Sequence, residues 1–370
     1  MKRAMVFIIS GCLLAAGSAA QTPPYSSDNS AGYGNAYPSV NPGVSRHAVG
    51  DLDGDGKDEV AVDFGGAGVW LDDGGSLTQL TASNPESLRA GDIDGEGVDE
   101  IAADLGSLGV WLWNAGSWNL LSSLNVDALA LGDVDGDGAD EVIGDFDTAG
   151  LWLLNGGAWT QVSGLNAEYV TTADPDGVGG ADIIGDFGSA GLWLCHGGAW
   201  GQIGGNADYV TRARINTGDF IAADFGTAGL WLISLGGWIQ VSGANPDYVI
   251  AANTDGDTVD EVVGDFTAAG LWLFDSTVWT QLSGVDAFYM VRADVNGDAR
   301  DEAAVSFGAT GLWLWNAGSW TQLSGVFSEY LVAADVDGDG RQEILSDFGG
   351  LGLWLWNEGA WSQVSGLNPD

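Results

Sequence analysis

The sequence predicts an all-β protein, a β-propeller of eight blades with four short antiparallel strands in each blade. Three observations lead to this fold class: a repeat of about 41 residues, strand-like segments within every repeat, and apolar residues on both faces of the second segment. A tryptophan that follows a Gly-Val or Gly-Leu pair marks each repeat. These tryptophans are Trp70, Trp111, Trp152, Trp193, Trp231, Trp272, Trp313 and Trp354.

The chain divides into three segments. Residues 1–20 contain Lys2 and Arg3, an apolar stretch and then small residues, a pattern typical of a signal peptide. Residues 21–43 are rich in Pro, Ser, Gly and Asn and are expected to form a flexible leader. Residues 44–370 form one domain of eight repeats. We therefore expect a secreted or cell-surface protein, with no later segment that reaches the roughly 18 apolar residues of a membrane span.

Each repeat is expected to contain four strands separated by turn residues. In the second strand of the first repeat, Val60 and Val62 point to one face and Ala61 points to the other. Apolar residues on both faces indicate burial on both faces, as between two neighbouring blades. In the third repeat the expected strands are 128–133, 141–146, 150–154 and 158–163.

The two ends of the array favour a closed ring. Neither end looks like the polar cap that an open solenoid requires. The chain enters near His47 on the first strand of the first repeat and stops just after the fourth strand of the eighth. We therefore expect side-chain packing between the first and eighth blades to close the ring, unless the leader adds a strand.

The composition is strongly acidic, with 52 Asp and Glu against 10 Lys and Arg and a formal net charge of -42. This charge excludes nucleic acid as a plausible partner. Hydrophobic residues make up 45% of the chain, which is enough for a packed core. After removal of the signal segment Cys195 is the one remaining cysteine, so no intrachain disulfide is expected.

Much of the acidic excess lies in a loop that recurs between the first and second expected strands. In the first repeat this loop runs from Asp51 to Glu59, and we number its residues as loop positions one to nine in every repeat. Acids at positions one, three, five and nine, with glycines between them, form an oxygen cage suited to a hard cation such as Ca²⁺. A solvated turn is the alternative, since Asp and Gly favour turns, but the spacing recurs six times.

The loops differ from EF-hands, because the last acid is ninth rather than twelfth and the flanking segments are strand-like. Position eight, such as Asp58, is expected to lie outside the first coordination shell, and position seven is expected to offer its backbone carbonyl. About six Ca²⁺ sites follow. The predicted ligands are Asp51, Asp53, Asp55, Lys57, Glu59; Asp92, Asp94, Glu96, Val98, Glu100; Asp133, Asp135, Asp137, Ala139, Glu141; Asn253, Asp255, Asp257, Val259, Glu261; Asp294, Asn296, Asp298, Arg300, Glu302; Asp335, Asp337, Asp339, Arg341 and Glu343.

Two repeats depart from the pattern. The fourth keeps Asp174, Asp176 and Asp182 but lacks the acid at position five, so a weak or empty site is expected there. The fifth replaces the loop with residues 212–218, which include Arg212 and Arg214, so no metal site is expected. These two arginines could pair with an anionic ligand or replace the lost cation.

The segment GDLDGDGKDEVAVDFGGAG and its sisters resemble the FG-GAP, or VCBS, repeat of integrin α-subunits and many secreted bacterial proteins. The resemblance covers residues 44–370. It implies a β-propeller with Ca²⁺ in inter-strand hairpins and a role in adhesion or glycan binding, as in integrins and a fungal lectin of similar build. These repeats are shorter than integrin-type blades, so the resemblance does not fix the number of blades.

Tryptophans on the expected third and fourth strands have two interpretations. The first is inter-blade packing, because aromatic side chains bury a large area. The second is a set of platforms on which sugar rings stack, and periodicity alone does not separate the two. The candidate ligand-binding residues on the fourth strands are Trp118, Trp159, Trp200, Trp238, Trp279, Trp320 and Trp361.

Two further positions recur with an expected structural role. An aspartate before the Phe-Gly turn, such as Asp63, is expected to accept hydrogen bonds from backbone N–H groups of the turn. Tyrosines that open the later first strands, such as Tyr209 and Tyr248, are expected to pack rather than line a rim.

The functional prediction is a calcium-binding adhesion or binding module for carbohydrate or an extracellular protein. The first alternative is a propeller enzyme that cleaves extracellular polysaccharide. The second alternative is a structural protein of the cell surface or matrix. Catalysis has little support, because His47 and His196 lie in different repeats and no Gly-x-Ser-x-Gly or zinc pattern is present. Cys195 beside His196 is better explained as drift at a turn.

Overall fold

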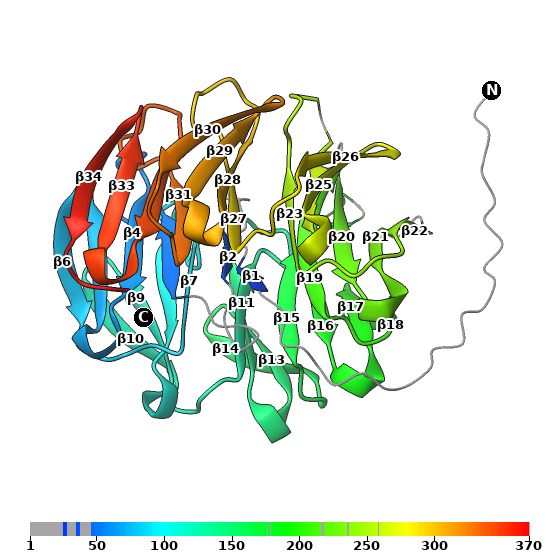
Figure 1. The fold of residues 1–370 in the computed structure, drawn as a ribbon. Coiled ribbons are helices and arrows are strands. Elements are labelled where there is room, and N and C mark those ends of the chain that lie inside the picture. The colour runs from blue at the N-terminus through cyan, green and yellow to red at the C-terminus, as the bar shows by residue number, and fades with distance from the viewer. Residues whose placement is uncertain are drawn as a thin grey trace.

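The computed structural model describes residues 25–27, 35–37, 46–175, 177, 179–215, 218–234, 237–257 and 259–369. Eight four-stranded antiparallel sheets are arranged in a ring, which is an eight-bladed β-propeller (Figure 1). The predicted fold class and blade number are therefore confirmed. The predicted signal peptide lies outside the described residues.

In each sheet the strands pair in chain order, so each blade is a four-stranded meander. The blades, numbered as the repeats, are: blade one, β3 (His47–Gly50), β4 (Glu59–Asp63), β5 (Val69–Asp73), β6 (Ser76–Thr81); blade two, β7 (Ser87–Gly91), β8 (Glu100–Asp104), β9 (Val110–Asn114), β10 (Ser117–Ser122); blade three, β11 (Ala128–Gly132), β12 (Glu141–Asp145), β13 (Leu151–Asn155), β14 (Ala158–Ser163); blade four, β15 (Tyr169–Ala173), β16 (Asp182–Asp186), β17 (Leu192–His196), β18 (Ala199–Gln202); blade five, β19 (Tyr209–Ile215), β20 (Gly218–Asp224), β21 (Leu230–Ser234), β22 (Gly237–Ser242); blade six, β23 (Tyr248–Ala252), β24 (Glu261–Asp265), β25 (Leu271–Asp275), β26 (Val278–Ser283); blade seven, β27 (Tyr289–Ala293), β28 (Glu302–Ser306), β29 (Leu312–Asn316), β30 (Ser319–Ser324); blade eight, β31 (Tyr330–Ala334), β32 (Glu343–Asp347), β33 (Leu353–Asn357), β34 (Ala360–Ser365).

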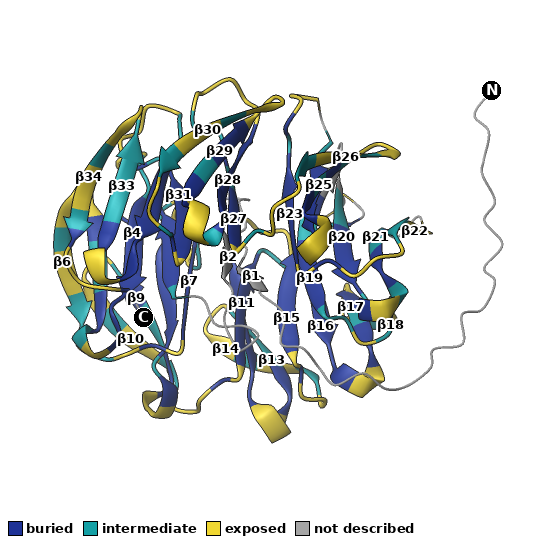
Figure 2. Ribbon diagram, in the orientation of Figure 1, coloured by how far each residue is buried: buried dark blue, intermediate teal, exposed yellow. Residues whose placement is uncertain are grey.

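Burial decreases from the first strand of each blade to the fourth. First and second strands are buried almost throughout, whereas fourth strands are largely exposed (Figure 2). First strands of consecutive blades contact each other, as β3 does with β7 and β27 does with β31, so they form the inner wall of the ring. The continuous apolar runs of the first two strands follow from this burial on both faces.

A short 3₁₀ helix joins the second and third strands of every blade, where the sequence predicted a simple turn. In blade one it begins after Phe64, and Gly65 has a φ of 57°, which favours glycine. The eight 3₁₀ helices are η1 (Gly65–Ala67), η2 (Gly106–Leu108), η3 (Asp147–Ala149), η4 (Gly188–Ala190), η5 (Gly226–Ala228), η6 (Thr267–Ala269), η7 (Gly308–Thr310) and η8 (Gly349–Leu351).

The ring closes between blades eight and one without a shared sheet, as expected. One core cluster joins residues of both blades, including Val60 and Leu345. The His47 ring lies 4.8 Å from the Tyr330 ring across this joint. A backbone bond from the Asp58 N–H to the Asp335 carbonyl, at 2.8 Å, adds to the packing.

The leader segment contributes a two-stranded antiparallel hairpin of β1 (Tyr25–Ser27) and β2 (Asn35–Tyr37). β1 lies against β19, and β2 lies against β27 and β31, so the hairpin is next to the inner strands (Figure 1). The hairpin forms a sheet of its own and adds no strand to a blade.

Candidate metal and ligand sites

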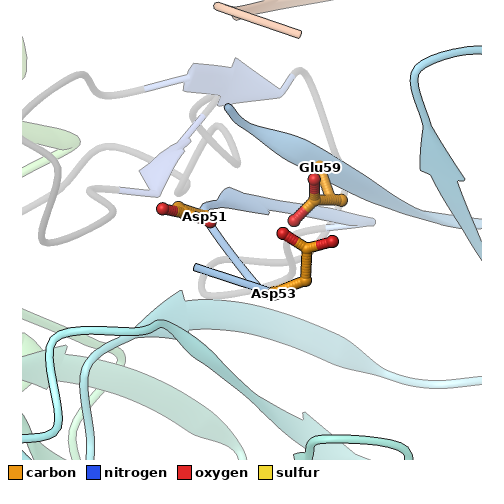
Figure 3. A group of neighbouring side chains, drawn as sticks. All are labelled: Asp51, Asp53 and Glu59. Carbon is orange, nitrogen blue, oxygen red and sulfur yellow. The ribbon is translucent and has the colours of Figure 1, made fainter. Parts of the chain in front are cut away.

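The acidic loops join the first and second strands of the blades and hold their carboxylates through backbone bonds. In blade one the N–H groups of Gly54 and Gly56 donate to Asp51, at 2.7 and 3.0 Å. The Leu52 N–H donates to Glu59 at 2.7 Å. Asp51, Asp53 and Glu59 consequently point toward one another (Figure 3).

Five of the six predicted loops bring three carboxylates together, with one oxygen of each within 4.8 Å of the others. Loop positions one, three and nine meet in blades one to three, positions three, five and nine in blade six, and positions one, three and five in blade eight. The groups are Asp51, Asp53, Glu59; Asp92, Asp94, Glu100; Asp133, Asp135, Glu141; Asp255, Asp257, Glu261; and Asp335, Asp337, Asp339.

The glutamate at position nine is buried in all six loops. Burial, with repulsion from neighbouring aspartates, raises the pKa of Glu59 to about 7. The same causes raise the pKa of the glutamates at this position in the other five loops to about 7. These are Glu100, Glu141, Glu261, Glu302 and Glu343.

The donor set fits a hard divalent cation such as Ca²⁺. The grouped side-chain atoms are all carboxylate oxygens, the ligand type that Ca²⁺ prefers. In blade two one oxygen of Asp92 is buried and accepts no hydrogen bond, so an acceptor remains for a cation. At the end of the third strand the Asn114 amide donates to Asp94 at 2.8 Å and to Glu100 at 2.9 Å, which orients both ligands.

Other predicted ligands lie beside these groups. In blade one the Asp55 carboxylate accepts bonds from the side chain and the N–H of Lys57, at 2.9 and 3.0 Å. The N–H at position seven donates to the position-five carboxylate in four more loops, and the role of the position-seven carbonyl stays a prediction. The predicted side-chain ligands outside the groups are Asp55, Glu96, Asp137, Asn253, Asp294, Asn296, Asp298, Glu302 and Glu343.

The loop of blade seven is the predicted site that departs furthest from this geometry. Its residues do not form a group of three carboxylates within the described part of the chain. The Asn296 amide donates to Glu302 at 2.6 Å, and Ala299 adopts a φ of 65° at position six, where the loops of blades one to three and eight have glycine. An L-residue in this conformation is strained.

Blades four and five carry the loops predicted to be weak and absent. In blade four His196 lies 2.9 Å from Asp182, whereas Asp176 falls outside the described residues. Cys195 is buried between blades, and burial raises the pKa of its thiol. In blade five the first two strands, β19 and β20, have seven residues each and pair as far as Ile215 and Gly218. Arg212 lies 3.7 Å from Asp219.

Loop position eight has a role that the sequence analysis missed. Its N–H donates to the carbonyl at position one of the preceding blade at seven joints between described residues, as from Asp99 to Asp51 at 2.8 Å. At four of these joints the side chain completes the pair, as when the Asp335 N–H donates to Asp58 at 2.8 Å. An acid that recurs at a position unsuited to the cage was the signal in the sequence.

The fourth-strand tryptophans lie at the joints between blades. The Trp118 indole N–H donates to the Leu80 carbonyl of the preceding blade at 3.0 Å, and Trp159, Trp200, Trp279, Trp320 and Trp361 make the same bond. Trp238 differs, because its side chain is 44% exposed. It stacks on Phe225 with ring centroids 6.2 Å apart. The additional tryptophans Trp113 and Trp315 are buried in the core.

The aspartate before the 3₁₀ turn holds that turn, as expected. Asp63 accepts the Gly65 N–H at 2.8 Å, and Asp104, Asp186, Asp224 and Asp347 accept the equivalent bond. The tyrosines that open the later first strands are buried, which agrees with the packing role expected for them. Neither set forms an exposed site.

An aromatic pair with one exposed and one partly buried member lies on the loops before β27 and β31, and the sequence analysis also missed it. Phe288 is 50% exposed, and its ring lies 4.6 Å from that of Phe327. In most other repeats these two positions hold an acid, such as Glu86, and Asn, such as Asn125. The replacement of polar repeat residues by phenylalanine was the available signal.

Comparisons with known proteins support the fold only. No protein-family model matches the chain, and no curated protein sequence matches it. The Dos1 propeller has a TM-score of 0.55 at 11% identity, over 92% of this chain and 93% of that one. Rhamnogalacturonan lyase YesW has a TM-score of 0.53 at 16% identity, over 91% and 74%. An Agrocybe aegerita lectin that recognises non-reducing terminal N-acetylglucosamine has a TM-score of 0.50 at 16% identity, over 88% and 94%. Among the described residues, no helix has the length and apolar character needed to cross a membrane.

Proposed function

We propose that this chain is a secreted, calcium-stabilised propeller that acts as a binding module for carbohydrate or an extracellular protein. The observation that carries the proposal is the set of five carboxylate groups, one at the same hairpin of each of five blades. Repulsion within each group is relieved when a cation binds. The resemblance of the loops to FG-GAP repeats supports Ca²⁺ as that cation.

Bound Ca²⁺ would supply positive charge and link the strands that flank each loop. The residues of the chain do the rest. Backbone N–H groups of the loop orient the carboxylates, and in blade two the Asn114 amide fixes two of them. Position eight ties the loops of blades one to four, seven and eight to the blade before each of them. Filling one loop therefore stiffens a joint between two blades as well as a hairpin.

For ligand binding we favour blade five, where Trp238 is the most exposed of the predicted tryptophan platforms. Trp231 packs against the Trp238 ring in an edge-to-face arrangement, and Phe225 lies parallel to it, which together fix the orientation of the Trp238 ring. A fixed, partly exposed aromatic ring is suited to stacking against an apolar face of a sugar.

Calorimetric titration of chelator-treated protein with CaCl₂ tests the metal proposal. We expect uptake at several sites with dissociation constants of about 10⁻⁴ to 10⁻³ M, the range of extracellular modules. A flat titration, together with an identical melting temperature in CaCl₂ and in chelator, would refute calcium stabilisation.

A glycan array tests the ligand. We expect the wild-type protein to bind a defined subset of glycans and W238A to lose that binding, whereas W118F keeps it. Equal binding by W238A would refute this platform. Shortened polysaccharide products in the same wells would show instead that the protein is an enzyme.

A further inference from the structure

The joint between blades four and five differs from the other joints in the packing of its aromatic rings. In five sister blades the phenylalanine before the 3₁₀ helix meets the fourth-strand tryptophan edge to face, with ring centroids 5.1 to 5.4 Å apart, as Phe146 meets Trp159. In blade five Phe225 and Trp238 are parallel, with an interplanar angle of 9° and centroids 6.2 Å apart. The relative orientation of the two rings therefore changes in this blade alone among the six that have the pair.

The same joint lacks a hydrogen bond that recurs elsewhere in the ring. Six fourth-strand tryptophans donate their indole N–H to a carbonyl of the preceding blade, at 2.7 to 3.0 Å. In blade four this repeat position is Ile203, because it follows Gln202 as Leu80 follows Gln79. Neither the Trp238 indole N–H nor the Ile203 carbonyl makes a hydrogen bond within the part of the chain that the structure describes. A donor and an acceptor are therefore both available at this joint.

The cause lies in the loop of blade four that follows β18. Gly204 stands where all the sister loops have Ser or Thr, such as Ser163, and a Cβ at Gly204 would lie 2.6 Å from the Phe225 ring. The ring thus occupies the space that a side chain takes up in the sister loops. The loop is also one residue shorter, as a comparison of residues 203–209 (IGGNADY) with residues 162–169 (VSGLNAEY) shows. Two local changes in blade four therefore accompany the exposure of Trp238.

We propose that this joint binds a neutral sugar through the groups that the missing bond leaves available. An apolar face of the sugar packs on the exposed part of Trp238, the indole N–H donates to one sugar hydroxyl, and a neighbouring hydroxyl donates to the Ile203 carbonyl. Sugars suit this site because they combine an apolar ring face with adjacent hydroxyl groups, each of which is both a donor and an acceptor. The inference rests on the proposed function, and it names the ligand class and the groups that bind it.

The charges near the joint favour a neutral sugar over an anionic one. The buried Asp224 directly precedes Phe225, and the Asp208 carboxylate lies beside the start of η5, where a Cβ at Gly226 would come within 2.5 Å of it. The chain as a whole carries a formal charge of -42. Repulsion from these carboxylates would weaken the binding of a uronate or a sulfated sugar.

A glycan array that holds neutral, uronate-containing and sulfated glycans tests the hydrogen bond and the ligand class. W238F keeps an aromatic ring and removes the indole N–H, so it should weaken binding of the best neutral glycan about 2- to 10-fold. The matched control W118F removes an indole N–H at another joint and should bind as wild type does.

The outcomes separate this inference from the proposed function. If W238A loses binding and W238F keeps it in full, the tryptophan platform stands and the inferred hydrogen bond is wrong. Equal binding of uronate or sulfated glycans would overturn the neutral class. An array on which the wild-type protein binds no glycan would overturn this inference together with the carbohydrate part of the proposed function.

G204S tests the role of the loop. A side chain at this position should displace the Phe225 ring, restore the edge-to-face arrangement of the sister blades and lower the affinity for the same glycan at least about tenfold. G164S is the matched control, because a Cβ at Gly164 meets no atom within 4 Å. Unchanged binding by G204S, or an equal loss in G164S, would show that the glycine does not create the site.

Hydrogen exchange of the indole N–H groups, followed by NMR, tests the available donor without a binding assay. The Trp238 signal, identified by its absence in W238F, should exchange faster than the Trp118 signal, whose N–H donates to Leu80 at 3.0 Å. Addition of the best neutral glycan from the array should slow the exchange of Trp238 only. Slow exchange of Trp238 in the free protein, or exchange that the glycan does not change, would overturn the proposal.

Discussion

The hairpins of blade one and blade five join equivalent strands with different chemistry. In blade one an eight-residue acidic loop separates β3 from β4, and its carboxylates converge. In blade five β19 and β20 pair through seven residues each, until Ile215 faces Gly218. Backbone hydrogen bonds thus replace the carboxylate cage.

This difference separates two tasks of the acidic loop. Blade five forms a complete four-stranded sheet, so the cage is not required for strand pairing or for the place of a blade in the ring. What the cage adds is a concentration of negative charge that is unfavourable until a cation binds. The acidic blades should therefore depend on Ca²⁺, and blade five should not.

The largest expected effect comes from removing one cage. The variant D51N/D53N/D55N should lose about 1.4 kcal/mol of stability at a Ca²⁺ concentration tenfold above the dissociation constant, and about 2.7 kcal/mol at a hundredfold excess. In chelator it should match wild type or exceed it, because repulsion is reduced. Thermal melts in CaCl₂ and in EDTA measure both values.

Blade five supplies the control for this experiment. D219N weakens the contact of Asp219 with Arg212 and should change stability equally in CaCl₂ and in EDTA. If the triple variant behaves in the same way as D219N, the loop of blade one has no calcium-dependent role.

The second effect concerns the joint that closes the ring. Asp58 accepts the Asp335 N–H at 2.8 Å, so D58A should cost about 1 to 2 kcal/mol, whereas D58N keeps an acceptor and should cost less. In blade four Ala181 stands at this position, and its N–H still donates to the Asp133 carbonyl. The stability lost in D58A should therefore come from the side-chain bond alone, because the backbone bond is expected to remain. Equal melting temperatures for D58A and D58N would show that the side-chain bond does not stabilise closure.

The fold could be predicted from the sequence because the sequence is repetitive. Eight copies of one pattern reveal strand order, burial on both faces and the acidic loop, and each expected strand of blade three is confirmed to within one residue. The contacts between neighbouring blades could not be predicted in the same way. Bonds from Asp58 to Asp335 or from Trp118 to Leu80 join neighbouring copies, and a single repeat gives no information about which copy lies next to it.

The candidate sites show a similar limit. Spacing indicated which acids share a loop, but not which three of them meet, and the three loop positions that meet differ between blades. Asp55 pairs with Lys57 in blade one, whereas Asp339, at the same position, joins the group in blade eight. Departures such as Phe288 and Phe327 are visible in the sequence, but only the fold shows that their rings contact each other.

The third prediction compares two fourth-strand tryptophans. W118F removes the indole donor of a bond to the preceding blade and should cost about 1 kcal/mol, the usual net value of a hydrogen bond. W238F should cost a few tenths of a kcal/mol, because Trp238 is 44% exposed. Chemical denaturation measures both. If the order is reversed, the exposed ring in blade five stabilises its joint more than the bonded rings do.

The smallest expected effect lies in the loop of blade seven and separates backbone strain from ligand chemistry. Ala299 has a φ of 65° at a position where Gly56, Gly138 and Gly340 adopt values of 85°, 96° and 85°. The left-handed conformation costs an L-residue about 1 to 2 kcal/mol, and the additional entropy of glycine in the unfolded chain offsets about 0.5 to 1 kcal/mol of the gain. A299G should therefore stabilise the protein by about 0.5 kcal/mol in thermal melts.

The matched control for A299G is A139G, one position further along the loop of blade three, where the backbone does not require glycine. It should destabilise by about 0.5 kcal/mol. If A299G also tightens Ca²⁺ binding, strain limits the seventh loop. If stability rises while Ca²⁺ uptake is unchanged, the carboxylates of that loop do not meet even when the backbone is relaxed, and Asn296 at position three is the reason that remains.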